Sequence, residues 1–517
     1  MRGTGLRTIS AVFEDAVERG SSKDWLTYED ETYTFAEAYR AIRQVAGALA
    51  ELGVERGSMV LATPRNTPAY VFTWFAATYL GAVLTTVNPK STKEELTGLV
   101  GQVDPRVVVS DSALRDTAEA AVSSAAPEAT LVMVEELMQS RLDPPPAAAR
   151  PDDVAVMIPT SGTTGRSKLV MQTQRAYVMA GEGFPYWLEL TESDRLMTSL
   201  PLFHINAPSY SIMGSVAAGA GLILLPRFSG SQFIDWSRKY GATEFNAIGA
   251  MIEILMRQPE LPNDADNPLR LCYTGPSPPK ERQLEIERRF GFQIVCGYAL
   301  SESPYGLIWS RRTRPFGTLG APRQHPTMGE INEARVLLPD GRGARPGEVG
   351  ELQLKNPAVM AGYHEMPEET ARVISDGWLK TGDLVEVNDD GTYTFVGRQK
   401  EIIRRRGENL SPLEVEAALE AHPLVSEAAV VGVPSELTEE EVKAFVLPTE
   451  GATIDVSELR DFVADRVARF KVPRFFEVVD ELPHTPTGRI AKHELPRERT
   501  SAEYDFDPQP AGKGESS

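Results

Sequence analysis

The sequence predicts an α/β protein with a large N-terminal domain of mixed α/β layers, a β-rich subdomain within it, and a small α+β domain at the C-terminal end. Two observations lead to this prediction. The 517 residues exceed the usual size of one hydrophobic core, so two or more domains are expected. Over the first half of the chain, amphipathic helical patterns alternate with apolar runs, which is typical of largely parallel sheets covered by helices.

The N-terminal domain is expected to begin with helices and strands in alternation. Residues 1–20 lack the continuous apolar core of a signal peptide and are predicted to form an amphipathic helix. Between Leu26 and about Pro226, helical patterns such as FAEAYRAIRQVAGALAEL alternate with strand-like runs such as MVLAT, AVLTTV and RVVVS. The most apolar stretch, residues 212–225, is too short and too rich in glycine to span a bilayer, so a buried helix followed by a strand is expected.

The pattern changes after about Pro315. Short alternating runs with Asp-Gly turns predict a β-rich subdomain of hairpins. Beyond Arg398 the pattern is compact α+β, and we place the domain boundary at residues 397–400. The predicted domains are therefore residues 1–397 and 398–500. A polar tail containing Gly and Pro, residues 501–517, is expected to be disordered.

The composition of the chain argues against several classes of binding partner and site. The formal charge of −20 argues against a nucleic acid partner, because binding a phosphate backbone requires a basic face, and it also disfavours an anionic membrane surface. Cys272 and Cys296 lie in apolar stretches without metal-ligand spacing and are expected to be core residues of a reduced, cytoplasmic protein. The six histidines are scattered and predict no metal cluster.

One loop indicates phosphate chemistry. The stretch TSGTTGRSK, residues 160–168, combines seven Gly, Ser or Thr residues with two cations. It follows the strand-like run DVAVMIP and precedes a helical pattern that begins TQRAYVMAG. Backbone N–H groups, hydroxyls and a cation between a strand and a helix are typical of sites that bind phosphate. The Walker pattern Gly-x-x-x-x-Gly-Lys-Ser/Thr cannot be aligned with these residues, so a P-loop kinase is excluded.

Four further stretches carry groups suited to a nucleotide. YALSES, residues 298–303, offers an aromatic ring, a hydroxyl and a carboxylate after a strand-like run. WLKTGD ends at Asp383 in a turn, where one carboxylate could accept bonds from both hydroxyls of a ribose. GRQKEIIRRRGENLSPLEVE starts at the domain boundary, and PTGRIAK lies near the end of the small domain.

With these motifs in this order and spacing, the chain resembles the adenylate-forming superfamily, which includes acyl-CoA synthetases, peptide-synthetase adenylation domains and firefly luciferases. The resemblance extends from the N-terminal helix to about Leu495. It implies that a carboxylate attacks the α-phosphate of ATP to give an acyl-adenylate and pyrophosphate, after which a thiol, usually of coenzyme A, displaces AMP. Such a reaction depends on electrostatics and orientation rather than on a protein nucleophile.

The resemblance implies roles for the nucleotide motifs. Tyr298 would stack on adenine, and Ser301 would hydrogen-bond the α-phosphate or the substrate carboxylate. Glu302 would hold Mg²⁺, since a hard cation that bridges phosphates takes one or two carboxylates. Asp383 and Arg398 would bind the ribose. The residues that would bind the rest of the nucleotide, chiefly its β- and γ-phosphates, are Thr160, Ser161, Gly162, Thr163, Thr164, Gly165, Lys168 and Gly275.

PLFHINA, residues 201–207, resembles the segment at the mouth of the family's acyl pocket. His204 is the candidate gate of that pocket, and the alternative is a structural histidine in a turn. Amino-acid-activating members usually have an Asp near this segment, so Phe203 and His204 disfavour an α-amino acid substrate. The further residues expected to line the pocket are Asn206, Tyr210, Gly249, Ala250 and Thr274.

The family rotates its small domain between the two half-reactions, so the resemblance implies a mobile C-terminal domain. Lys400 occupies the place of the hinge. The cations that follow it either reach coenzyme A phosphates or form a solvated charged face. They belong to the stretch Arg404, Arg405, Arg406 and Gly407.

One motif departs from the family. In PTGRIAK the family places a lysine that bridges the substrate carboxylate and the α-phosphate, whereas this chain has Arg489. Arginine is always charged and binds phosphate and carboxylate through a planar fork, but it is larger than lysine. Three interpretations remain open: Arg489 performs the lysine's role, Lys492 performs it, or adenylation is impaired.

The leading interpretation is an AMP-forming acyl-CoA ligase that acts on a non-amino carboxylic acid, with Mg²⁺ as cofactor and ATP and coenzyme A as cosubstrates. A second enzyme interpretation transfers the acyl group to the thiol of a carrier protein, and a luciferase-like oxygenase is a more distant one. A non-catalytic protein that binds nucleotide or a preformed adenylate is the alternative from a different class. A cytoplasmic homodimer without a nucleic acid or membrane partner is the expected state.

Overall fold

The structure is a computed structural model of the whole chain. It describes residues 7–63, 65–160, 167–275, 277–310, 313–405, 408–435, 440–485 and 490–506. The chain forms two compact units. The large unit comprises Met1–Arg335, Gln353–Lys380 and Asp389–Thr394, and the small unit comprises Val336–Leu352, Thr381–Asn388 and Phe395–Ser517. The sequence-based boundary at residues 397/398 stays a prediction.

A seven-stranded sheet carries the glycine-rich loop in the large unit. Its strand order is β18-β8-β7-β4-β3-β5-β6. The strands β4, β3, β5 and β6 run parallel, and β8 pairs antiparallel with both β7 and β18. The bounds are β3 (Met59–Ala62), β4 (Val83–Thr86), β5 (Val107–Ser110), β6 (Thr130–Met133), β7 (Val154–Thr160), β8 (Lys168–Thr173) and β18 (Gly362–Tyr363).

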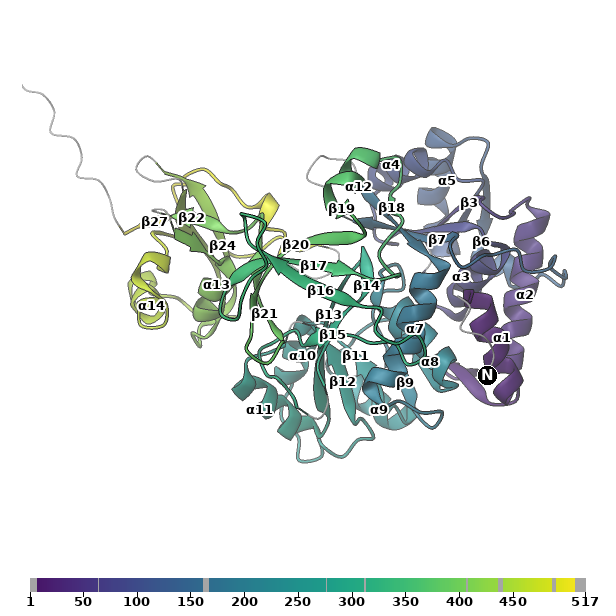
Figure 1. Cartoon of the computed structure of the whole chain (residues 1–517), viewed down its shortest axis with the longest axis horizontal. Coiled ribbons are helices and arrows are strands. Elements are labelled where there is room, and N and C mark those ends of the chain that lie inside the picture. The colour runs from purple at the N-terminus through teal and green to yellow at the C-terminus, as the bar shows by residue number, and fades with distance from the viewer. Residues whose placement is uncertain are drawn as a thin grey trace, which may run out of the picture. The chain divides into compact units, whose positions relative to one another are not determined.

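Helices cover both faces of this sheet, because its central strands are apolar on both sides. Figure 1 shows α4 (Lys93–Val103) and α5 (Arg115–Ala125) on one side, with α1 (Ile9–Gly20), α2 (Phe35–Glu51) and α3 (Pro68–Leu80) on the other. Thr34 and Glu37 form a capping box that fixes the start of α2. The amphipathic helix expected at the N-terminus is confirmed as α1.

A nine-stranded sheet forms the other half of the large unit, in the order β15-β14-β13-β12-β11-β9-β10-β1-β2. Its strands from β13 to β1 are parallel, and β2, β14 and β15 are antiparallel additions at the two edges. The bounds are β1 (Asp24–Tyr28), β2 (Glu31–Thr34), β9 (Arg195–Thr198), β10 (Gly221–Leu224), β11 (Glu244–Asn246), β12 (Leu271–Thr274), β13 (Gln293–Leu300), β14 (Ser303–Ile308) and β15 (Ala321–Pro322).

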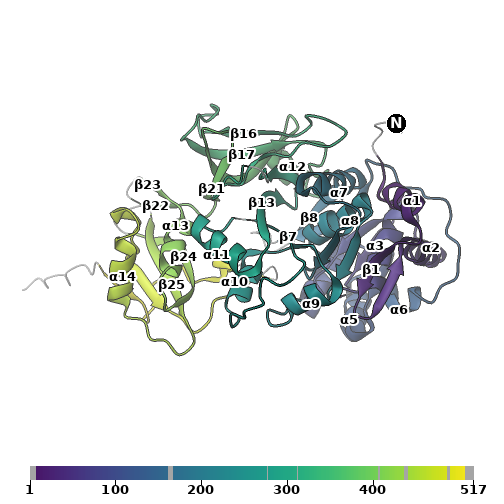
Figure 2. The same ribbon diagram turned by 90° about the horizontal axis from the view of Figure 1, so that it is seen from below.

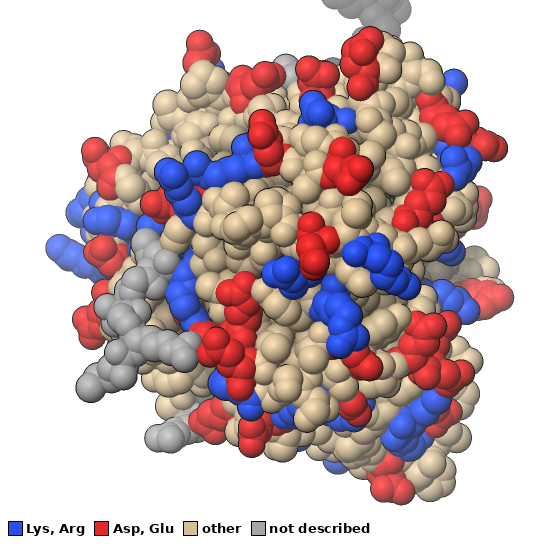
Figure 3. Space-filling view, turned by 90° about the vertical axis from the view of Figure 1, so that its right-hand side faces the viewer, with Lys and Arg blue, Asp and Glu red and all other residues tan. Residues whose placement is uncertain are grey.

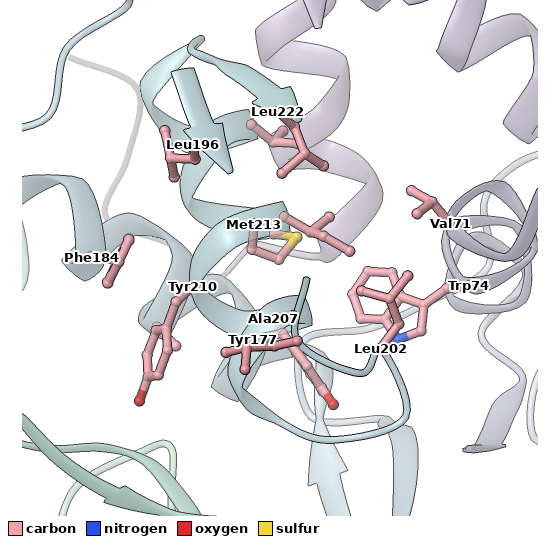
Figure 4. Close-up of a cluster of buried hydrophobic side chains, with 14 of the residues drawn as sticks. Val71, Trp74, Tyr177, Phe184, Leu196, Leu202, Ala207, Tyr210, Met213 and Leu222 are labelled. Carbon is pink, nitrogen blue, oxygen red and sulfur yellow. The ribbon is translucent and has the colours of Figure 1, made fainter. Parts of the chain in front are cut away.

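One large apolar core joins the two sheets to the helices between them, and Figure 4 shows part of it around Met213. Residues 212–225, predicted to form a buried helix followed by a strand, contain α8 (Met213–Ala218) and β10, so this prediction is confirmed. The remaining helices of this unit are α6 (Val134–Leu137), α7 (Gln174–Leu188), the π-helix η2 (Ala207–Ile212), α8 (Met213–Ala218), α9 (Phe233–Tyr240), α10 (Gly249–Met256), α11 (Lys280–Phe290) and α12 (Pro367–Val373), with a 3-10 turn η1 (Ser112–Leu114).

The predicted β-rich region forms a five-stranded sheet in the order β16-β17-β20-β19, with β21 paired to β20. Four of its strands, β16, β17, β20 and β21, each run from one unit into the other along the chain. The bounds are β16 (Glu333–Leu337), β17 (Val349–Lys355), β19 (Ile374–Ser375), β20 (Trp378–Val387) and β21 (Tyr393–Arg398).

The C-terminal part is α+β, as predicted. A sheet of β24 (Val425–Pro434), β25 (Glu440–Pro448), β26 (Phe475–Val478) and β27 (Tyr504–Asp505) separates two apolar clusters, one of which includes α13 (Pro412–Glu420) and α14 (Val456–Ala464). Figure 2 shows these two helices beside β24 and β25. The other elements are a hairpin of β22 (Ile403–Arg405) and β23 (Glu408–Leu410) and the 3-10 turns η3 (Arg469–Lys471) and η4 (Lys492–Glu494).

The tail differs from its prediction over its first residues. Disorder was expected from residue 501, but β27 pairs with β26, and Glu503 lies 2.9 Å from the buried Lys443 ammonium. β27 has only two residues and is held by strand pairing and an ion pair beside it, so no hydrophobic pattern in the sequence predicts it. Residues 507–517 lie outside the described part of the chain.

The outer surface mixes charges of both signs. Figure 3 shows acidic and basic side chains interspersed over one face of the molecule. Within the described residues, no helix is both long enough and apolar enough to cross a bilayer.

Candidate active site

An antiparallel hairpin presents the glycine-rich loop. β7 ends at Thr160 and β8 begins at Lys168, and the Thr160 hydroxyl donates to the Lys168 carbonyl over 3.2 Å. The expected strand–loop–helix order omitted β8, so the N-terminus of α7 is separated from the loop by a six-residue strand. The predicted phosphate-binding residues Ser161, Gly162, Thr163, Thr164 and Gly165 lie outside the described residues.

The Lys168 side chain lies between a carboxylate and an aromatic ring. Its Nζ is 2.7 Å from Glu369 Oε2 and 5.0 Å from the ring centroid of Tyr363. The sheet explains the second contact. Tyr363 in β18 is opposite Val170 in β8, and Lys168 lies two residues from Val170 on the same face.

The turn between β13 and β14 carries Glu302 of the YALSES motif, which contacts Tyr363. The Tyr363 hydroxyl donates to Glu302 Oε1 over 2.9 Å. Two backbone contacts fix the turn: Gln172 Nε2 donates to the Ser301 carbonyl over 2.6 Å, and the Met360 N–H donates to the Glu302 carbonyl over 2.8 Å. Lys168 and Glu302, predicted from separate motifs, are therefore joined through one tyrosine.

The adenine candidate Tyr298 is half-buried near the end of β13, opposite Leu307 of β14. The neighbouring strand β12 ends at Thr274, which is buried and whose Oγ1 has no hydrogen-bond partner among the described residues. A Cβ at Gly275 would lie 2.3 Å from the Gly297 carbonyl oxygen, so only glycine allows this approach of the two backbones.

The predicted acyl-pocket residues lie on segments that follow β9 and β11. The ring of His204 lies 4.3 Å from that of Phe203. Asn246, at the end of β11, donates through Nδ2 to Asn206 Oδ1 over 2.7 Å. Gly249 and Ala250 are exposed at the start of α10. The structure therefore connects Asn206 with the nine-stranded sheet, whereas Gly249 and Ala250 face solvent.

Tyr210 is buried in η2 and contacts Arg323, which was not predicted from the sequence as a site residue. Figure 4 shows its ring beside Phe184, with the hydroxyl directed away from the apolar cluster. That hydroxyl donates to the Pro304 carbonyl over 2.6 Å and lies 3.4 Å from Arg323 Nη1.

Arg323 is itself only 1% exposed. Its Nε donates to the Leu307 carbonyl over 2.7 Å, and its guanidinium lies 4.7–5.5 Å from the ring centroids of Trp187, Tyr210 and Tyr273. No local pattern distinguishes Arg323 from a surface arginine in the sequence.

The predicted ribose residues form a pair within the small unit. Arg398 Nε lies 3.2 Å from Asp383 Oδ1. The Asp383 side chain is buried in β20, whereas Arg398, at the end of β21, is half-exposed. Lys400, the predicted hinge, is exposed two residues later.

Lys492, the alternative to Arg489 in the sequence analysis, forms ion pairs within the small unit. Its Nζ is 2.7 Å from Glu416 Oε1 in α13 and 3.6 Å from Glu401. The Val430 N–H also donates to Glu416 Oε1, over 2.5 Å. Burial raises the pKa of Glu416, although Lys492 acts in the opposite direction. Lys492 is thus part of the interior of the small unit, and Arg489 lies outside the described residues.

Arg405 also faces the interior of the small unit, which argues against both of its expected roles, contact with coenzyme A phosphates and a solvated charged face. Its guanidinium is 2.7 Å from Glu441 and donates to the Val472 carbonyl over 2.9 Å. The period of two in β22 directs this side chain inward. Arg406, Gly407 and the side chain of Arg404 lie outside the described residues.

Further predictions from the sequence concern the two cysteines and possible clusters of acidic residues and histidines. Cys272 and Cys296 are free and buried, as predicted, and burial raises the pKa of the Cys296 thiol to about 12. The described residues contain no group of three or more His, Cys, Asp or Glu side chains that could hold a metal ion by themselves.

Comparisons with known proteins agree with this arrangement. The AMP-binding enzyme family model matches residues 13–364, and the AMP-binding enzyme C-terminal domain matches residues 414–489. A crotonobetaine/carnitine–CoA ligase of Salmonella agona (strain SL483) is 30% identical over 487 residues, covering 90% of this chain and 93% of that protein.

Two solved structures show the same fold. O-succinylbenzoate CoA synthetase from Bacillus subtilis, in complex with its acyl-adenylate intermediate, has a TM-score of 0.85 and 27% identity, covering 94% of this chain and 98% of its own. A benzoate CoA ligase from Burkholderia xenovorans LB400 has a TM-score of 0.85 and 26% identity, covering 95% of this chain and 100% of its own. The resemblance inferred from the motifs is therefore confirmed.

Proposed function

The chain belongs to the AMP-binding enzyme family, and we propose that it is an ATP-dependent ligase that joins a non-amino carboxylic acid to coenzyme A through an acyl-adenylate. As an AMP-forming acid–CoA ligase it takes ATP and coenzyme A as cosubstrates. The observation that carries the proposal is the row Lys168–Tyr363–Glu302 beside the glycine-rich hairpin. A cation close to a carboxylate is what a triphosphate and its metal ion would require, and this supports the proposal.

Glu302 is the proposed ligand of Mg²⁺. Its carboxylate is half-buried, and one of its two oxygens already accepts a hydrogen bond from Tyr363. Mg²⁺ usually takes one or two protein carboxylates and completes its shell with phosphate oxygens and water, so no larger cluster of acids is needed. When bound, it would neutralise charge on the phosphates.

The chain's own residues would then orient the nucleotide. Lys168 would bind a β- or γ-phosphate oxygen together with the loop amides, and Tyr298 would stack on the adenine. Asp383 would accept bonds from the ribose hydroxyls, with Arg398 beside it. Ser301, at the turn that follows Tyr298, would donate to the α-phosphate, where charge develops as the carboxylate attacks.

The cation that bridges the substrate carboxylate and the α-phosphate is proposed to be Arg489. The support comes from Lys492, which is 14% exposed and already paired with the buried Glu416. Moving Lys492 to a substrate would leave that carboxylate buried without its cation, which is costly. An arginine can bind both anions at once through its planar fork.

His204, Asn206, Tyr210 and Thr274 are the proposed residues of the acyl pocket, and of these Tyr210 and Thr274 are buried. Transfer to a carrier protein in place of coenzyme A, a homodimer and a cytoplasmic location stay predictions.

The proposal is tested by measuring pyrophosphate, AMP and thioester from the purified chain with a panel of aliphatic, aryl and polycyclic acids. Coenzyme A and a carrier protein are supplied in separate reactions. We expect AMP and acyl-CoA in equal amounts with at least one acid. Thioester formed only on the carrier protein would favour the second enzyme interpretation, and ATP binding without pyrophosphate release from any acid would favour a binding protein.

A further inference from the structure

We propose that Tyr363 is a positioning residue for adenylation, which holds Lys168 with its ring and Glu302 with its hydroxyl, and that Glu369 is an internal anion which the triphosphate displaces from Lys168. This inference rests on the proposed function, since it assigns Lys168 to phosphate and Glu302 to Mg²⁺. It adds two residues that no motif of the sequence identified.

The backbone of Tyr363 is fixed on both sides, so its ring has little freedom. β18 pairs with Met171 and Val170 of β8, and the Tyr363 N–H donates to Thr370 Oγ1 over 2.9 Å. Tyr363 is 7% exposed. The register of the sheet therefore sets the place of the ring relative to Lys168.

The hydroxyl of Tyr363 orients one oxygen of a charged group. It donates to Glu302 Oε1, which leaves Oε2 for another partner. A tyrosine hydroxyl carries its proton at physiological pH, so it can act as the donor in this contact. Groups that orient a metal ligand in this way commonly change metal affinity about 10- to 100-fold when removed.

Glu369 is placed to exchange partners. It lies in α12 with 32% of its side chain exposed, and its two oxygens contact Lys168 and Arg372. A phosphate that takes Lys168 leaves Glu369 paired with Arg372, so the exchange does not strand a carboxylate. The neighbouring Glu368 is exposed on the same short helix and has the same formal charge.

Calorimetric titration of ATP, with and without MgCl₂, tests the role of Tyr363 without turnover. In Tyr363→Phe the ring stays under Lys168 and only the hydroxyl is lost. We expect the Mg²⁺-dependent gain in ATP affinity to fall about tenfold, while binding without metal changes less than about twofold. The control is Tyr39→Phe, which removes a 2.6 Å hydrogen bond to Glu14 elsewhere in the large unit.

The role of Glu369 is tested in the same assay without metal. Glu369→Gln removes the competing anion, and we expect it to bind ATP about threefold more tightly than Glu368→Gln, as suits a partly exposed ion pair. Equal affinities of these two variants, or weaker binding by Glu369→Gln, would overturn the displacement.

The controls separate failure of this inference from failure of the proposed site. If the unaltered chain binds Mg·ATP and Tyr363→Phe shows the same Mg²⁺-dependent gain as Tyr39→Phe, the positioning role is overturned alone. If the unaltered chain does not bind ATP at all, the proposed nucleotide site is overturned as well. Thermal unfolding of each variant checks that the fold is intact.

Discussion

Two lysines of this protein contact a glutamate at the same distance, but the two glutamates have different surroundings. Lys168 Nζ is 2.7 Å from Glu369 in the large unit, and Lys492 Nζ is 2.7 Å from Glu416 in the small unit. Glu369 is 32% exposed and has Arg372 as a second partner, whereas Glu416 is 9% exposed and also accepts the Val430 N–H.

The surroundings of each ion pair, rather than its geometry, therefore decide whether the lysine is available to bind a substrate. A half-exposed carboxylate with a second cation can release its lysine at little cost. A buried carboxylate cannot, because removing its partner leaves an uncompensated charge in a poorly solvated place. Lys168 is therefore suited to bind phosphate, and Lys492 is suited to stabilise the small unit.

Replacing Lys168 should change the rate of adenylation more than any other substitution considered below. Lys168→Ala should lower pyrophosphate release about 100- to 1,000-fold, because one preorganised charge on the phosphates is lost. The free energy of unfolding should change by less than about 1 kcal/mol. Lys239→Ala is the control, since Lys239 lies over the ring of Tyr240 and pairs with Asp30 away from the site. A rate like that of the control would contradict the role of Lys168.

The next effect is on stability. Lys492→Ala should destabilise the small unit by about 3–5 kcal/mol, because Glu416 is left buried without its cation. Lys471→Ala, which breaks an exposed pair with Glu414 in the same unit, should cost less than about 1 kcal/mol. Hydrogen exchange of the β24 amides in the folded full chain measures both. Equal protection in the two variants would show that Lys492 is not a structural cation.

A smaller effect is expected on the pH dependence of stability, through the buried carboxylate of Glu244. Both oxygens of Glu244 are buried and have no hydrogen-bond partner among the described residues, and burial raises the pKa of Glu244 well above its ordinary value. The folded state then keeps a proton that the unfolded state releases, so stability should fall as pH rises above the ordinary pKa.

Glu244→Gln should remove this part of the pH dependence. We expect its melting temperature to exceed that of the unaltered chain by about 2 °C or more at pH 8, and the difference to shrink towards pH 5. Differential scanning calorimetry at the two pH values is the measurement. A difference that does not vary with pH would contradict the raised pKa.

Periodic elements were predictable from the sequence, and elements held by distant partners were not. The parallel strands β3, β4 and β5 and the helix α2 follow from their apolar periods. β8 was missed because it runs directly into α7 and is defined by its pairing with β7. The two-residue strands β18 and β27 have no period that could reveal them.

The motifs of the candidate site could be found in the sequence, but the contacts that join them could not. The motifs that contain Lys168 and Glu302 are visible as short patterns of polar residues. Their links through Tyr363 and Glu369 join residues up to 201 positions apart, and no local pattern reports such a contact. The same holds for Arg323, whose burial depends on three rings from separate segments, and for Arg405, which was expected at the surface.

We propose that the bridging cation of adenylation is Arg489 and not Lys492. Pyrophosphate release by Arg489→Ala and Lys492→Ala, measured side by side and normalised to the folded fraction of each variant, distinguishes the two. We expect a loss of about 100-fold or more in Arg489→Ala and a change of less than about threefold in Lys492→Ala. A severe loss in Lys492→Ala with near-normal release in Arg489→Ala would contradict the account.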